Sequence, residues 1–150
     1  MDTNLFVLLV VGAVNIRRIQ NFKRTQRYTE RDYELLLSEI GRYQNRVYTV
    51  AHVMAEVNDL IDLPGSERKR AREVLKEFLG IVTEPALHSR VAAQDLNYER
   101  LGLVDAAILT IAREHGCMVL TDDLDLYVTL SRREMPVLNF THLRAREWGM

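Results

Sequence analysis

Acidic side chains recur where a parallel sheet would place them for chemistry. They precede the first apolar run, lie on predicted helices, or directly follow a short apolar run, and they are Asp2, Glu56, Asp105, Asp122, Asp123 and Asp125. Ligands of open parallel sheets bind beyond the carboxyl ends of the strands. Carboxylates gathered there without matching basic groups repel one another, and a hard divalent cation relieves that repulsion. The set of acids therefore predicts a metal site.

Glu56 and Asp105 support this prediction best, because each stands inside an apolar stretch, residues 53–57 and 103–109. Burying a carboxylate costs free energy unless the group is paired or bound to a metal. A structural explanation is open for Asp105, since a helix dipole and free N–H groups stabilise an aspartate in the first turn. Structural networks also perturb carboxylates, so each acid becomes informative only together with the others.

Helical and strand patterns alternate along the chain, which predicts an α/β three-layer sandwich with a small, mostly parallel sheet between helices. Helices are expected at residues 29–45, 51–63, 66–79, 104–115 and 123–132, the first opened by a capping box of Thr29 and Asp32 and the third capped by Ser66. Strands are expected at 47–50, 81–83, 117–120 and 137–139. The run 5–14 has no period and fits a buried strand or a buried helix, and 85–102 is expected to hold a short helix and a loop.

Composition narrows the class of protein. A length of 150 residues predicts a single domain over residues 1–150. The 20 basic and 21 acidic residues give no overall nucleic-acid signal, and the lone Cys117 excludes a disulfide scaffold and a Cys-rich zinc site. The longest apolar run has no preceding basic residues and is too short to cross a bilayer, so we expect a cytoplasmic protein without a membrane partner.

Four short motifs, taken in order, resemble those of PIN domains. They are Asp2-Thr3-Asn4, Ala55-Glu56-Val57, Leu103-Val104-Asp105-Ala106-Ala107-Ile108-Leu109, and Leu120-Thr121-Asp122-Asp123-Leu124-Asp125-Leu126. The resemblance implies a parallel sheet between helices and a Mg²⁺- or Mn²⁺-dependent ribonuclease, as in the toxins of toxin–antitoxin pairs. PIN domains have a strand before the first motif. Only Met1 precedes it here, so that strand is expected to be truncated or missing, or the chain to start further upstream.

The same resemblance assigns roles to individual residues. The catalytic, metal-binding acids would be Asp2, Glu56, Asp105 and Asp123, with Asp125 as a fifth ligand for one or two ions. Thr3, Asn4 and Thr121 would orient the carboxylates. The expected partners are an RNA substrate, an antitoxin protein and a second copy of the chain.

A basic stretch between the first apolar run and the Glu56 helix suits a nucleic acid. Lys23, Arg24 and Arg27 could contact phosphates, while the interleaved Phe22 and Tyr28 could stack under bases. The alternative is a solvated loop whose two rings pack onto the core.

Two functions stay open at this level. One is an endoribonuclease that hydrolyses phosphodiester bonds with a metal-activated water. The other is a non-catalytic PIN-fold module that binds RNA or a protein and has an incomplete metal site. Residues 123–134 have the length of an EF-hand loop, but Tyr127 and Val128 stand where an oxygen ligand and a glycine are needed.

Overall fold

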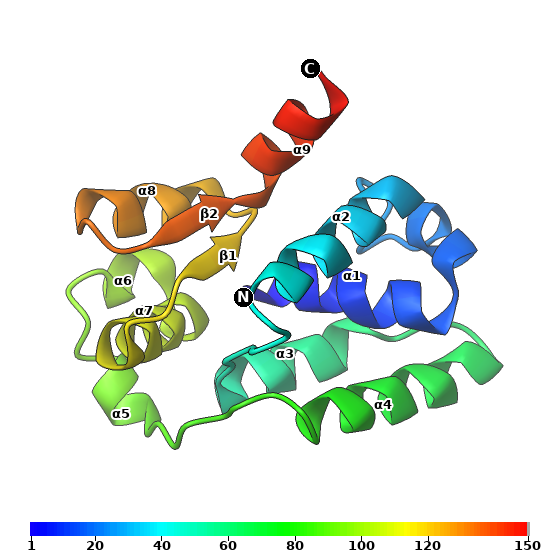
Figure 1. Cartoon of the computed structure of the whole chain (residues 1–150). Coiled ribbons are helices and arrows are strands. Elements are labelled where there is room, and N and C mark those ends of the chain that lie inside the picture. Colours follow the sequence, from blue (N-terminus) through cyan, green and yellow to red (C-terminus); the bar gives the residue numbers. More distant parts are fainter. Residues whose placement is uncertain (150) are drawn as a thin grey trace. The chain divides into compact units, whose positions relative to one another are not determined.

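The computed structural model describes residues 1–149, which fall into two compact units. The first unit contains residues 1–2 and 48–53 and the chain from Glu84 onward, and the second contains residues 3–47 and 54–83. The described chain is mostly helical with a small parallel sheet (Figure 1), so the predicted α/β class is confirmed. None of the helices in residues 1–149 combines the length and hydropathy needed to cross a bilayer.

The second unit is built around α1. Its elements are α1 (Thr3–Val14), η1 (Ile16–Asn21), α2 (Glu30–Arg42), most of α3 (Ala51–Leu60) and α4 (Ser66–Leu79). Figure 1 shows α2 and α4 beside α1, and η1 also contacts it. Every residue from Leu5 to Val11 is buried, and a helix that is apolar on all sides belongs in a core. Burial on all sides explains why the run 5–14 has no hydrophobic period. The structure shows that this run is a helix.

Helix α2 confirms the predicted capping box. The Thr29 hydroxyl accepts from the Asp32 backbone N–H, and the Asp32 carboxylate accepts from the Thr29 backbone N–H at 2.7 Å. The same helix packs on α1 at Gly12, where an added Cβ would lie only 2.3 Å from the Tyr33 ring. The close approach of these two helices therefore depends on a glycine.

The first unit holds the sheet. Its elements are α5 (Ser89–Ala92), α6 (Tyr98–Leu101), α7 (Leu103–His115), β1 (Val119–Thr121), α8 (Leu124–Arg132), β2 (Val137–Asn139) and α9 (Phe140–Trp148). Strands β1 and β2 pair in parallel with Leu120 opposite Leu138, and α8 is the crossover between them. Gly116 ends α7 in the left-handed region with φ 61°, as its position predicted.

Several local predictions were wrong. Residues 47–50 and 81–83 hold single bridge positions instead of strands, and the Thr83 N–H bonds the Val47 carbonyl at 2.8 Å. A strand needs a ladder of backbone bonds to a partner, and a single bond between the two runs does not make one. Helix α4 begins at Ser66 itself, with Gly65 at the N-cap position and no side-chain cap. Strand β1 starts two residues later than expected, and α9 was not predicted.

Candidate functional site

The Asp2 side chain is held at the carboxyl end of β1. Its backbone N–H donates to the Leu120 carbonyl at 3.1 Å. Its carboxylate Oδ2 accepts from the Asp122 backbone N–H at 2.9 Å and from the Thr121 hydroxyl. Only 4% of Asp2 is exposed, so these donors replace the water that a buried carboxylate has lost. Strand β1 therefore fixes both the backbone and the carboxylate of Asp2.

Thr121 connects this carboxylate to Asp123. The fully buried Thr121 hydroxyl also accepts from the Asp123 backbone N–H at 3.0 Å. Asp123 in turn caps α8, because its Oδ1 accepts from the Leu126 backbone N–H at 2.8 Å. One hydroxyl thus contacts two of the residues predicted to bind metal, and the orienting role of Thr121 stays a prediction.

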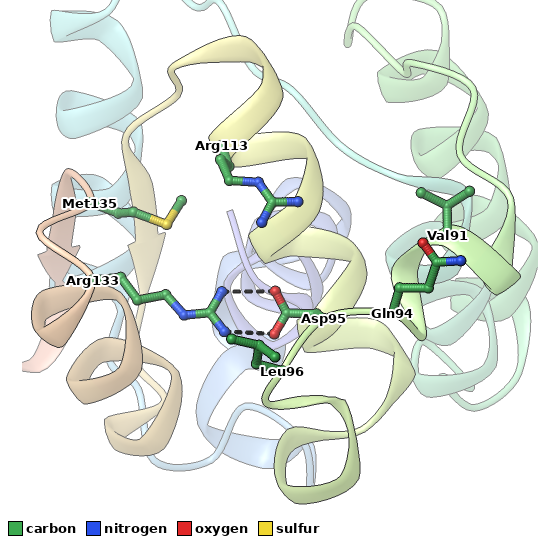
Figure 2. Close-up of a pocket in the computed structure, with 7 residues that line it drawn as sticks. All are labelled: Val91, Gln94, Asp95, Leu96, Arg113, Arg133 and Met135. Atoms are coloured by element: carbon green, nitrogen blue, oxygen red, sulfur yellow. Dashed lines mark hydrogen bonds and ion pairs between the residues drawn. The ribbon is translucent and has the colours of Figure 1, made fainter.

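Asp105 lies in the first turn of α7. Helix α8 crosses between two parallel strands and so runs antiparallel to them, and Figure 2 shows the C-terminal end of α7 turning back into β1. The N-terminal ends of both helices therefore point to the carboxyl edge of the sheet, with Asp105 in the first turn of α7 and Asp123 at the N-cap of α8. Both helix N-termini also favour negative charge there.

Glu56 belongs to the second unit, on α3, and its environment corrects one premise. The buried side of this segment consists of Val53, Met54 and Val57, whereas Glu56 is exposed. The expectation that Glu56 is buried among its apolar neighbours was wrong, because the helical turn places the carboxylate away from them. Its Oε2 accepts a 2.7 Å hydrogen bond from the Thr3 hydroxyl.

The remaining predicted site residues lie in or next to the first turns of α1 and α8. Asn4 follows Thr3 in the first turn of α1 and is partly buried. Asp125, in the first turn of α8, is largely exposed and lies 3.8 Å from the Arg100 guanidinium. Asp122 contributes its backbone N–H to Asp2.

The donor chemistry suits a hard cation, because carboxylate oxygens are the ligands preferred by Mg²⁺ and Mn²⁺. Neither unit, over residues 1–149, gathers three or more His, Cys, Asp or Glu side chains at a spacing that holds a metal ion. In the first unit the Thr121 hydroxyl connects the Asp2 carboxylate to the backbone N–H of Asp123.

The basic segment of the second unit keeps its cations exposed and hides its rings. Lys23, Arg24 and Arg27 are exposed, whereas Phe22 and Tyr28 are 6% and 1% exposed. Arg27 lies over the Tyr28 ring at 4.9 Å and donates to its hydroxyl at 2.9 Å. The idea that these rings stack under bases was wrong, and the alternative that they pack onto the core is confirmed. The exposed cations can still contact phosphates.

Comparison with known proteins agrees with the four motifs. The family model described as PIN domain matches residues 2–129, which includes every predicted site acid. No curated protein and no solved structure matches the chain. PIN domains are generally nucleases and typically depend on divalent metal ions. With the matched region covering most of its length, the chain belongs to the PIN domain family.

Proposed function

We propose that this protein is a divalent-metal-dependent endoribonuclease that hydrolyses phosphodiester bonds of single-stranded or structured RNA. The observation that carries the proposal is the junction at the end of β1, where the Thr121 hydroxyl bonds both the Asp2 carboxylate and the Asp123 backbone. Membership of a family of nucleases gives this acidic junction a chemical context.

The proposed ligands of Mg²⁺ or Mn²⁺ are the carboxylates of Asp2, Glu56, Asp105 and Asp123, with Asp125 as an additional ligand. A divalent ion, when bound, would supply a more acidic water and neutralise charge on the scissile phosphate. The chain's own residues limit carboxylate rotation beforehand. Thr121 and the Asp122 N–H hold Asp2, the α8 cap holds Asp123, and Thr3 holds Glu56. Such orienting bonds often change metal affinity or activity about 10–100-fold.

RNA is the proposed substrate, with Lys23, Arg24 and Arg27 contacting its phosphates. These side chains are exposed, and cations that contact phosphates bind nucleic acid without reading its sequence. The proposed setting is the cytoplasm. In a toxin–antitoxin pair, an antitoxin would present Arg or Lys side chains to the acidic junction, and a second copy of the chain is the other proposed protein partner.

The direct test is cleavage of a fluorescently labelled single-stranded RNA by the purified protein. We expect cleavage with Mn²⁺ or Mg²⁺ and none with EDTA, and a DNA of the same sequence serves as a parallel substrate. Asp105→Asn should lower the rate more than about 100-fold, since it removes a proposed ligand. Glu114→Gln is the matched control, because Glu114 is an exposed acid in the last turn of the same helix. Cleavage by Asp105→Asn at the wild-type rate would contradict the proposal.

A second function, a PIN-fold module that binds RNA or a protein without cleaving it, is favoured by one observation. Neither unit by itself assembles a three-ligand metal site within residues 1–149. Calorimetry with Mn²⁺ separates the two functions. The nuclease requires Mn²⁺ binding that Glu56→Gln and Asp105→Asn weaken. The binding module predicts RNA retention in gel-shift experiments, with neither Mn²⁺ binding nor cleavage.

A further inference from the structure

The first unit contains a cavity at the opposite end of α7 and α8 from the acidic junction. It has a volume of about 510 Å³, within the range of roughly 300–1,000 Å³ that is typical of ligand sites. Arg113 from the last turn of α7 and Arg133 from the C-cap of α8 line it, together with Asp95 from the α5–α6 loop (Figure 2). The acids Asp105 and Asp123 and the arginines Arg113 and Arg133 therefore lie at opposite ends of the same two helices.

One arginine of the cavity is already matched. Arg133 donates from Nη1 and Nη2 to the two Asp95 carboxylate oxygens at 2.7 and 2.8 Å, and the Asn97 N–H adds a bond of 2.9 Å. The Asp95 side chain is 1% exposed. The hydrogen bonds from Arg133 lower the pKa of Asp95, and the same bonds raise the pKa of Arg133. This pair is ionised and internally satisfied.

The second arginine brings an unmatched charge. Arg113 makes no ion pair or hydrogen bond to any part of residues 1–149, although its charge also contributes to lowering the pKa of Asp95. Figure 2 shows its guanidinium directed toward the Asp95–Arg133 pair. With one carboxylate and two guanidinium groups, the cavity carries a net charge of about +1 at neutral pH. The forked N–H donors of Arg113 match a carboxylate in geometry as well as charge.

Apolar side chains stand around this charge. Leu96 is 96% exposed, Val91 is also exposed, and Met135 lines the same cavity. Figure 2 shows Met135 and Val91 on opposite sides of the Asp95–Arg133 pair, with Leu96 next to Asp95. An arginine without an ion pair, in a cavity that also has apolar lining, suits an amphipathic ligand. A phosphate of RNA would satisfy the charge and leave these apolar groups without a partner.

We propose that this cavity binds a carboxylate that bears an aliphatic tail. The carboxylate would pair with Arg113, next to the Asp95–Arg133 pair, and the tail would lie against Met135 and Leu96. Free aliphatic acids and the C-terminal residue of a peptide share this chemistry. The site is independent of the nuclease function, since it uses none of the acids assigned to metal binding.

The test is calorimetric titration of the full chain, backed by amide chemical-shift mapping. The probes are octanoate, acetyl-Leu-Leu with a free carboxylate, and the same dipeptide as its C-terminal amide. We expect at least one of the two acids to bind and the amide not to bind. Octanoate alone would identify a free-acid site, and the dipeptide alone would identify a peptide C-terminus.

Variants link the binding to the cavity. Arg113→Gln should weaken acid binding by at least about tenfold, as expected for loss of a charged hydrogen-bond donor. Arg113 is exposed and makes no ion pair or hydrogen bond within residues 1–149, so this variant should fold. Arg132→Gln, which removes an exposed arginine in the last turn of α8, is the control and should bind normally. Equal binding of the amide, unchanged binding by Arg113→Gln, preferential binding of inorganic phosphate, or no binding of either acid would overturn the proposal.

Discussion

Replacing Thr121 with valine tests the junction at the end of β1. Valine keeps the shape of threonine and removes only the hydroxyl. Two bonds disappear with it, one donated to the Asp2 carboxylate and one accepted from the Asp123 N–H at 3.0 Å. Thr121 is fully buried, so water does not easily replace its hydroxyl as the partner of either group. The Asp122 N–H remains as a donor to Asp2.

The expected loss of unfolding free energy follows from these two bonds. A hydrogen bond to a charged group contributes about 1.5–3 kcal/mol, and an orphaned buried N–H costs about 1–3 kcal/mol. The valine methyl recovers about 0.8 kcal/mol through apolar burial. Because the two bonds share one oxygen and are not additive, we expect Thr121→Val to lower the free energy of unfolding by about 2–4 kcal/mol. That is a large part of the total stability of an ordinary domain.

Thr121→Ser is the matched control, because serine keeps the hydroxyl and loses only a methyl group. Its expected cost is about 1 kcal/mol, the value for removing one buried methyl. Urea denaturation followed by far-ultraviolet circular dichroism gives both free energies, and RNA cleavage below the unfolding transition reports the site. If the proposed function holds, Thr121→Val should lose about 10–100-fold in rate, whereas Thr121→Ser should stay active. A valine variant as stable as the serine variant would refute the assigned role of the hydroxyl.

Two further predictions concern packing and acid stability. Gly12→Ala should lower the melting temperature, since the added Cβ would lie 2.3 Å from the Tyr33 ring and overpacking costs about 1–3 kcal/mol. Gly41→Ala is the control and should not lower it, because there is open space around Gly41. A Gly12→Ala protein at least as stable as wild type would contradict the α1–α2 packing. Hydrogen bonds from Arg133 lower the pKa of Asp95 below its usual 3.8, so this carboxylate stabilises the fold above about pH 4 and loses that effect as the pH falls through the lowered pKa. The stability difference between wild type and Asp95→Asn, from urea midpoints, should therefore be larger at pH 7 than at pH 3, and an equal difference at both would show that the ionised pair does not stabilise the fold.

Features that depend on neighbours in sequence could be predicted. The capping box of Thr29 and Asp32 needs only four consecutive residues, and Gly116 marks the end of α7 because its backbone adopts a positive φ. Strand β2 was predicted with its observed bounds. The order of the acidic motifs was enough to identify the PIN family, since the order and spacing of motifs can be read without knowing how the chain packs.

Features that depend on what surrounds a residue required the tertiary structure. The run 5–14 fits a strand or a helix by composition, and only its burial among α2, α4 and η1 decides for α1. Glu56 sits among apolar neighbours in sequence, yet the helical turn leaves it exposed. Phe22 and Tyr28 are suited to base stacking by residue type, but both rings are buried in the core.

By itself, then, the sequence determined the family, the acidic residues and the local signals that start and stop helices. Each of these depends only on residue types that lie close together in the sequence or follow one another in a fixed order. Tertiary structure alone decided which donors hold each carboxylate. It also created the cavity of Asp95, Arg113 and Arg133, whose members come from a loop and two helix ends. Burial and long-range pairing arise from the packing of distant segments, and no local pattern encodes which distant groups will meet.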